Sequence, residues 1–219
     1  MAIEGNHLGL PQRVPLKDKH SDMRTLYLKQ NSSNIKIITA IINRGGAGVL
    51  PTDTIYGIVG SALNKKAVSR IYKLRKRNPL KPFIILISSV NDLSKFSVKT
   101  DIFTKRMLAK VWPGKVSVVL ACANKKFRYL HRGTDSLAFR LQKNKVLIGI
   151  LKQTGPLIAP SANLEGGKPA KTIKEAQKYF GDKVDFYLNG GKTISVPSTL
   201  IKIENGKIKI LRKGAVKIK

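Results

Sequence analysis

Hydroxyl groups are concentrated in the segment 51–57. Thr52, Thr54 and Tyr56 place three hydroxyls within five residues. Such groups can hold a small polar ligand by hydrogen bonds without adding charge. Ordinary turn chemistry explains the segment equally well, because Pro, Asp, Thr and Gly are common turn formers. On these residues alone, a ligand loop and a plain turn are equally good interpretations.

The segment 73–82 is strongly cationic. Five cations lie within nine residues, namely Lys73, Arg75, Lys76, Arg77 and Lys81. One interpretation is a solvated run, since cations are favoured at a helix C-terminus. Two prolines and an apolar strand follow at once, however, and would hold the segment in place. Fixed guanidinium and ammonium groups suit phosphate binding, so we favour a phosphate site.

A third polar segment, 159–167, is rich in small residues. Small side chains let backbone N–H groups approach an anion, and Ser161 and Asn163 add side-chain donors. The segment matches neither the P-loop pattern nor GxGxxG, so we predict neither a P-loop nor a Rossmann site.

The fourth candidate is formed by two segments near the C-terminal end of the sequence. Ser198 lies in Val-Pro-Ser-Thr, and Arg212 lies in Ile-Leu-Arg-Lys-Gly. Ser198 could hold a ligand and Arg212 could reach a phosphate. A surface hairpin with ordinary hydroxyls explains these residues equally well.

The remaining composition excludes several chemistries. Between Met23 and Thr134 the carboxylates are Asp53, Asp92 and Asp101, too few for a hydrolase based on paired carboxylates. Asp182 and Asp185 are expected to cap or flank a turn. Cys122, the single cysteine, lies in an apolar run and is expected to be buried rather than nucleophilic. The three histidines are scattered, so we predict no structural zinc site.

The overall charge is high. The 219 residues contain 42 Lys plus Arg and 12 Asp plus Glu, a net charge of +30. Such a surface attracts polyanions, including RNA, although a merely solvated lysine-rich surface is equally consistent. There is no membrane-length apolar run and no signal-peptide core, so we expect a soluble, cytoplasmic protein without a membrane partner. We expect a flexible N-terminal extension over residues 1–23 and one domain over 24–219.

These segments must be positioned by interleaved strands and helices. The apolar patterns predict strands at 25–29, 83–87, 116–120, 137–141, 156–160, 196–203 and 207–211. They predict helices at about 32–44, 65–74, 101–110, 146–151 and 173–180. Ser32 or Ser33 is expected to cap the first helix and Thr172 the last. Residues 204–206 indicate a hairpin turn. The class is therefore α/β, with a twisted mixed sheet.

Taken together, the motifs resemble those of the YrdC-like threonylcarbamoyl-AMP synthases. They are PTDTIYGI, the basic segment ending in KPF, VWPGKVSVVL, LAFRL, PLIAPSANLEGGKPA, VPSTL and ILRKGA, in the order of that family. They extend from about Gly46 to Ala215, over three-quarters of the chain. PTDTxYG with PSAN at this separation is highly specific, and the length resembles the short form of the family.

The resemblance implies a fold and a reaction. The fold would be an α/β twisted mixed sheet with flanking helices around a basic concave cavity. The enzyme would be a nucleotidyltransferase, L-threonylcarbamoyladenylate synthase, acting on L-threonine, bicarbonate and ATP. A downstream threonylcarbamoyl-transferase complex would move the product group onto a tRNA adenosine. Mg²⁺ would bind through the triphosphate, and no metal site is expected in the protein itself.

Site residues follow from the resemblance by motif position. Those implied to bind threonine are Thr54, Arg140, Ala159 and Ser198. Those implied to bind ATP are Arg77, Lys81, Ser136, Ser161, Asn163, Ala170 and Arg212. The implied catalytic cations are Arg75 and Arg77. Arg75 stands where the family usually has a lysine, which keeps the charge but exchanges an ammonium for a planar guanidinium.

One alternative function remains at this point, a non-catalytic protein of the same fold that binds double-stranded RNA or tRNA. The charge of +30 and Arg75 motivate it. Aromatic residues total 6%, with little interleaving of aromatic and basic residues for base stacking, and this favours the enzyme. The enzyme hypothesis is also chemically coherent, because the substrate carboxylate attacks and the protein need only position and stabilise phosphate charge.

Overall fold

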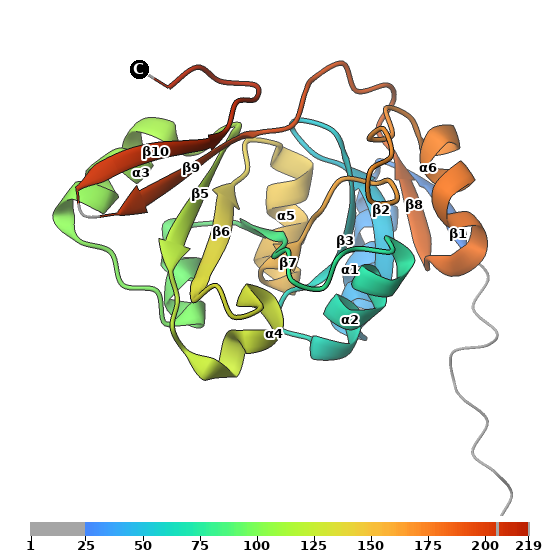
Figure 1. Cartoon of the computed structure of the whole chain (residues 1–219). Coiled ribbons are helices and arrows are strands. Elements are labelled where there is room, and N and C mark those ends of the chain that lie inside the picture. Colours follow the sequence, from blue (N-terminus) through green and yellow to red (C-terminus); the bar gives the residue numbers. More distant parts are fainter. Residues whose placement is uncertain (1–24, 205, 219) are drawn as a thin grey trace, which may run out of the picture.

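A single mixed sheet forms the centre of the molecule. The computed structural model describes residues 25–204 and 206–218, so the predicted extension over residues 1–23 lies outside the described residues. In the described part, ten strands run in the order β1-β8-β2-β3-β7-β4-β6-β5-β9-β10 (Figure 1). They are β1 (Leu26–Lys29), β2 (Ala47–Pro51), β3 (Tyr56–Ser61), β4 (Ile84–Ile87), β5 (Val116–Ala121), β6 (Ser136–Leu141), β7 (Leu157–Ile158), β8 (Phe186–Asn189), β9 (Thr199–Glu204) and β10 (Lys207–Arg212).

Alternating apolar residues give the sheet two buried faces. Val49 and Ile58 belong to one hydrophobic cluster, whereas their neighbours Leu50 and Val59 belong to the other. Successive side chains of a strand point to opposite faces, so nearly continuous apolar strands need cover on both sides. The helices supply that cover.

Each face of the sheet has its own helices. On one face, α1 (Ser32–Asn43) and α5 (Lys145–Thr154) each contribute buried isoleucines or leucines to the second cluster. On the other face, apolar residues of α2 (Lys65–Leu74), α3 (Ile102–Val111), α4 (Arg128–His131) and α6 (Ile173–Phe180) join the first cluster. The short 3-10 helices are η1 (Val90–Phe96), η2 (Lys125–Phe127) and η3 (Gly181–Lys183).

Polar side chains fix where the main helices begin. Asn31, Asn64, Asp101, Asn144 and Thr172 each accept a hydrogen bond from a backbone N–H in the first turn of the helix that follows. Such caps satisfy donors that the helix itself leaves free. The predicted cap at Thr172 is confirmed. The predicted cap at Ser32 or Ser33 is wrong, because Asn31 precedes both and takes that place.

The predicted α/β class and mixed sheet are confirmed, with local differences. The helix predicted at 65–74 matches α2, and the predicted hairpin matches β9 and β10. Three strands were not predicted, namely β2, β3 and β8. Two of them flank the turn at 52–55, where the glycines and hydroxyls of the surrounding segments obscured the short apolar runs.

Asp185 lies in the bend between η3 and β8, and its carboxylate also joins elements that are distant in the sequence. Its carboxylate forms a two-point ion pair with Arg70 of α2, with Nη1–Oδ2 at 2.6 Å and Nη2–Oδ1 at 2.9 Å. It also accepts a hydrogen bond from the backbone N–H of Ala47 at 2.7 Å. Bidentate arginine–carboxylate pairs are directional. Asp185 therefore ties α2 to the start of β2 and to the residue before β8.

We predict that Asp185→Ala lowers the free energy of unfolding by about 2 kcal/mol, because three charge-assisted hydrogen bonds are lost. Urea denaturation measures this change. The matched control is Asp182→Ala, since exposed Asp182 accepts one hydrogen bond, from the Tyr27 hydroxyl. Equal effects of the two substitutions would contradict this role for Asp185.

Candidate functional site

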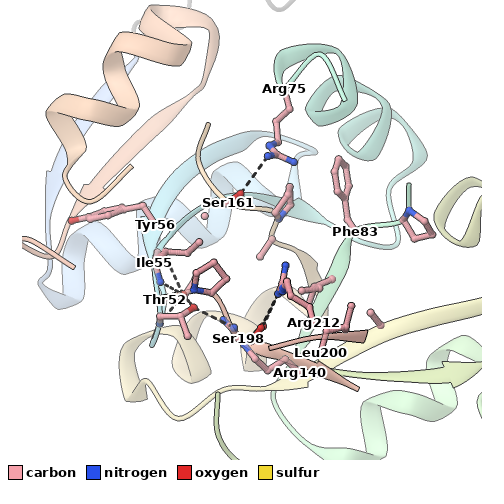
Figure 2. Close-up of a pocket in the computed structure, with 18 of the residues that line it drawn as sticks. Thr52, Ile55, Tyr56, Arg75, Phe83, Arg140, Ser161, Ser198, Leu200 and Arg212 are labelled. Atoms are coloured by element: carbon pink, nitrogen blue, oxygen red, sulfur yellow. Dashed lines mark hydrogen bonds between the residues drawn. The ribbon is translucent and has the colours of Figure 1, made fainter. Parts of the chain in front are cut away.

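Loops from distant parts of the sequence meet around one cavity of about 210 Å³. The turn 52–57, the segment after α2, the start of β4, the segment after β7 and the region 197–200 all contribute to its wall, as do β6 and β10. Figure 2 shows Arg75 approaching from one side and Arg140 with Arg212 from the other. Four arginines line the cavity, namely Arg75, Arg77, Arg140 and Arg212.

The loop after β7 is hydrogen-bonded to the first residues of β3. Ile58 N–H donates to Pro160 O at 3.0 Å, and Ala162 N–H donates to Tyr56 O at 2.9 Å. A Cβ atom on Gly57 would lie 3.3 Å from Pro160 O, so the close approach favours glycine there. This pairing brings the Ser161 hydroxyl to the cavity wall.

Arg75 forms the inner part of the cationic wall. Its side chain is buried, and its Nε donates to the Asn163 carbonyl oxygen at 2.9 Å. Its Nη2 donates to Ser161 Oγ and Asn163 Oδ1, both at 3.3 Å. Burial and then the nearby Arg77 charge lower the pKa of Arg75 to about 10, so it is still protonated at neutral pH.

Arg77 and its neighbours surround one carboxylate. Arg77 Nη1 lies 3.2 Å from Glu165 Oε1, and Lys81 Nζ lies 3.1 Å from the same oxygen. Packing positions this segment, since Tyr72 stacks on Phe83 with ring centroids 4.0 Å apart and donates its hydroxyl to Lys81 O. Arg75 and Arg77 of this segment line the cavity, whereas Lys73, Lys76 and Lys81 are exposed.

Arg140 is held in a buried polar group. Its Nη2 lies 3.1 Å from Asp53 Oδ1, and its Nη1 donates to Thr54 Oγ1 at 3.2 Å. With the Gln142 amide oxygen facing Arg140, that oxygen accepts from Nε at 2.9 Å while the amide nitrogen donates to Asp53. Burial lowers the pKa of Arg140, and the Asp53 charge opposes this shift.

Arg212 and Ser198 complete the wall on the side of the hairpin. Arg212 Nη2 donates to Ser198 O at 2.8 Å, and Ser198 Oγ lies 2.8 Å from Ser117 Oγ. Burial and then the Arg77 charge lower the pKa of Arg212, and both guanidinium groups line the same cavity. Such a cluster of like charges is stabilised by a bound anion.

Comparison with known proteins identifies the family. A family model described as Telomere recombination, Sua5_yciO_yrdC, matches residues 40–214. The chain belongs to this family. A relative from Methanocaldococcus jannaschii is 30% identical over 206 residues, which cover 93% of this chain and 96% of the relative. The threonylcarbamoyl-AMP synthase of Pyrococcus abyssi is 30% identical over 186 residues, which cover 83% of this chain and 54% of the relative.

Solved structures of family members share the fold of this chain. The P. abyssi Sua5 complexed with L-threonine superposes with a TM-score of 0.79 at 27% identity, covering 87% of this chain and 57% of that one. The E. coli YciO structure has a TM-score of 0.79 at 22% identity, covering 90% and 98% of the two chains. This chain thus spans nearly all of some family members and about half of the Sua5 proteins.

Most residues implied by the family motifs meet at the cavity. The implied site residues that line it are Thr54, Arg75, Arg77, Arg140, Ala159, Ser161, Ser198 and Arg212. Tyr56 and Thr52, singled out for their hydroxyls, line it too, but both hydroxyls are already engaged within the protein. Tyr56 donates to Gly191 O at 2.7 Å, and Thr52 donates to Ile55 O at 2.7 Å.

Four implied ATP contacts lie outside the cavity wall. Asn163 is buried, and its amide binds the carbonyls of Leu164 and Gly167 and the guanidinium of Arg75. Ala170 is a buried core residue. Lys81 does not line the cavity, but its ammonium pairs with Glu165, which also pairs with Arg77 of the cavity wall. Ser136 shares a face of β6 with Arg140, but it begins the strand and borders a separate cavity near the hairpin.

Three residues that support the site were not proposed from the sequence. Asp53 and Gln142 hold Arg140, and Glu165 pairs with Arg77 and Lys81. The sequence signal that could have identified two of them is the scarcity of acidic residues. Asp53 is the single acid in PTDTIYGI, and Glu165 is the single acid in PLIAPSANLEGGKPA. A lone acid among cationic and hydroxyl-bearing segments is a candidate partner for one of the arginines.

Cys122 is buried, as predicted, and burial raises the pKa of its thiol. Among residues 25–204 and 206–218, no group of three or more His, Cys, Asp or Glu is arranged to hold a metal ion. In the same ranges, no helix is both long and apolar enough to cross a bilayer.

We predict that Gln142→Leu lowers the free energy of unfolding by about 2 kcal/mol, because buried Asp53 and Arg140 each lose a hydrogen-bond partner. Thermal and urea denaturation measure the loss. Gln153→Leu provides the control, since this exposed glutamine of α5 bonds its own helix through Gly149 O. A loss no larger than in the control would mean that the amide does not support the ion pair.

Proposed function

We propose that this protein is an L-threonylcarbamoyladenylate synthase. It would form threonylcarbamoyl-AMP and pyrophosphate from L-threonine, bicarbonate and ATP, as a nucleotidyltransferase. The observation that carries the proposal is the meeting of Thr54, Arg77, Arg140 and Arg212 at one cavity. Family relatives named threonylcarbamoyl-AMP synthase, and the P. abyssi structure with L-threonine, support it.

The end of the cavity around Arg140 suits the amino acid. Arg140 supplies a guanidinium whose orientation is set by Asp53 and Gln142, and a guanidinium matches a carboxylate in geometry and charge. Thr54 and Ser198 offer hydroxyls beside it, and Ala159 contributes to the same wall. We infer that the threonine carboxylate binds Arg140 and that its amino group, carrying the added carboxyl, points toward the phosphates.

The opposite end suits the triphosphate. The carboxylate of N-carboxy-threonine would attack the α-phosphorus of ATP, forming the acyl-phosphate bond while the bond to pyrophosphate breaks. Arg75, Arg77 and Ser161 line this end, and Arg212 approaches from the Arg140 side (Figure 2), so cations would lie on both sides of the developing charge. Fixed donors aimed at developing charge are an effective source of rate acceleration. This reaction needs positioned cations and no protein nucleophile.

Mg²⁺ would be held by the triphosphate itself. The nearest carboxylates, Asp53 and Glu165, are each already paired with cations. Residues of the chain are therefore poorly suited to hold the ion alone, whereas phosphate oxygens are good Mg²⁺ ligands. The ion would supply further neutralisation of phosphate charge.

The product would serve tRNA modification in the cytoplasm. A threonylcarbamoyl-transferase complex would move the group from the adenylate onto a tRNA adenosine, and the basic surface of this chain could contact RNA. The alternative of a non-catalytic RNA-binding protein is not favoured, since relatives are named as synthases.

We predict that pyrophosphate release from ATP requires both threonine and bicarbonate, and that Arg77→Ala lowers kcat/KM about 100-fold through the loss of a charged donor. A coupled pyrophosphate assay measures both effects. Arg106→Ala, at an exposed position of α3, is the control for loss of positive charge. Undiminished release without threonine would overturn the proposed function.

We predict that Thr54→Val raises the KM for threonine about fivefold to tenfold, because one neutral hydrogen bond beside the amino acid is lost. The KM for ATP, measured on the same variant, should stay within twofold and serves as the internal control. Equal changes in both constants would mean that Thr54 supports the whole cavity rather than the threonine end.

A further inference from the structure

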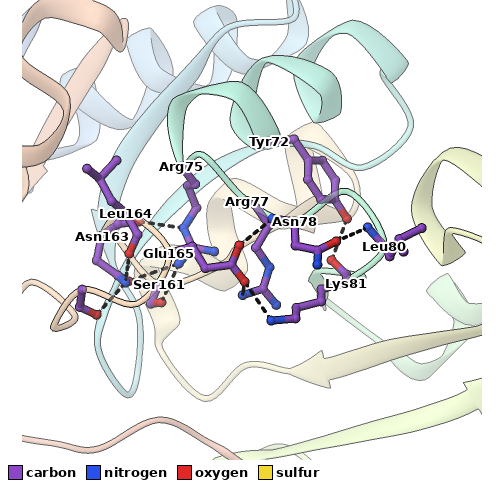
Figure 3. A network of polar contacts seen from close by, with 11 residues as sticks. Tyr72, Arg75, Arg77, Asn78, Leu80, Lys81, Ser161, Asn163, Leu164 and Glu165 are labelled. Atoms are coloured by element: carbon purple, nitrogen blue, oxygen red, sulfur yellow. Dashed lines mark hydrogen bonds and ion pairs between the residues drawn. The ribbon is translucent and has the colours of Figure 1, made fainter.

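One carboxylate lies beside the cavity, where it pairs with Arg77 of the cavity wall. Glu165 Oε1 lies 3.2 Å from Arg77 Nη1 and 3.1 Å from Lys81 Nζ. Its other oxygen, Oε2, accepts from the backbone N–H of Asn78 at 2.5 Å. Figure 3 shows the carboxylate between these three donors. A guanidinium, an ammonium and a backbone N–H thus converge on one anionic group.

These three donors are of the kinds that bind phosphate in proteins. Arginine, lysine and free backbone N–H groups recur in phosphate sites because each offers a fixed donor with positive character. We propose that Arg77, Lys81 and the Asn78 N–H form a phosphate seat, that Glu165 fills it in the free protein, and that a polyphosphate must displace Glu165. The proposal deepens the function proposed above, because it assumes that the triphosphate of ATP enters this cavity.

Displacement requires rotation of one side chain and no refolding of the loop. The loop backbone is anchored separately, since Glu165 N–H donates to Arg75 O at 2.9 Å and Asn163 Nδ2 donates to Gly167 O at 2.8 Å. The Glu165 side chain is 25% exposed and can turn toward solvent. Gly166 follows it with φ of +81°, and a Cβ atom added to Gly166 would have no neighbour within 4 Å, so the space beside the chain is open.

The competition favours a polyphosphate over the resident carboxylate. Glu165 brings a single negative charge to a partly exposed site, where ion pairs are weak. A triphosphate brings several charges and more acceptor oxygens. Arg77 Nε is buried without an acceptor among the described residues, so Glu165 does not satisfy every donor of this guanidinium. Glu165 thus keeps the seat ordered but lowers its affinity for the incoming anion.

The test measures binding of inorganic tripolyphosphate by titration calorimetry, without threonine or turnover. Glu165→Gln retains the size of the side chain and an oxygen for the Asn78 N–H, but removes the charge. We expect it to bind tripolyphosphate at least about fivefold more tightly than the wild type, since a competing anion is gone. The control is Glu204→Gln, which makes the same change in net charge at an exposed glutamate paired with Lys202, outside the cavity.

The outcomes separate the alternatives. Tighter binding by Glu165→Gln alone, abolished when Lys81→Ala is added, supports the seat. Unchanged or weaker binding would overturn it, because Glu165 would then stay paired with Arg77 and Lys81 when the anion binds. Equal tightening in Glu204→Gln would also overturn it, as a general charge effect. Glu165→Ala repeats the measurement should the glutamine variant be unstable. A positive result combined with threonine-independent turnover would refute the proposed function while leaving the phosphate seat intact.

Discussion

The site depends on keeping four positively charged guanidinium groups around one cavity. Arg75, Arg77, Arg140 and Arg212 all line it, and like charges at short range repel each other. Burial, and then the charge of Arg77, lower the pKa of Arg75 and of Arg212, so the surroundings disfavour both charges. The folding free energy of the rest of the molecule must therefore hold these groups together.

The protein opposes this repulsion with a small set of acceptors placed behind or between the arginines. Asp53 and Gln142 hold Arg140, the Asn163 carbonyl and side chain hold Arg75, and Glu165 bridges Arg77 and Lys81. Most of these acceptors lie in the same loops as the hydroxyls that line the cavity. Compensation is incomplete, so an anionic ligand adds favourable electrostatic interactions that the free protein lacks.

Much of this arrangement was predictable from the sequence, for definite reasons. Helix α2 has a clear apolar period and a cap at Asn64, and two cations just after it, Arg75 and Arg77, line the cavity. Strands β2 and β3 were missed because glycines and a polar turn interrupt their short apolar runs.

Asn163 and Ala170 were predicted at the ligand but lie behind the wall, since motif position does not show which way a side chain points. The pairing of Asp53 with Arg140 joins residues far apart in the sequence, and no local pattern indicates it.

The proposed reaction requires one cavity to receive both an amino acid and a nucleotide. A crystal structure of the protein with L-threonine and a non-hydrolysable ATP analogue tests this most directly. We predict the threonine carboxylate at Arg140 and the phosphates between Arg77 and Arg212, within a few ångströms of each other. Ligands bound at separate places, or phosphates away from these arginines, would contradict the proposed reaction.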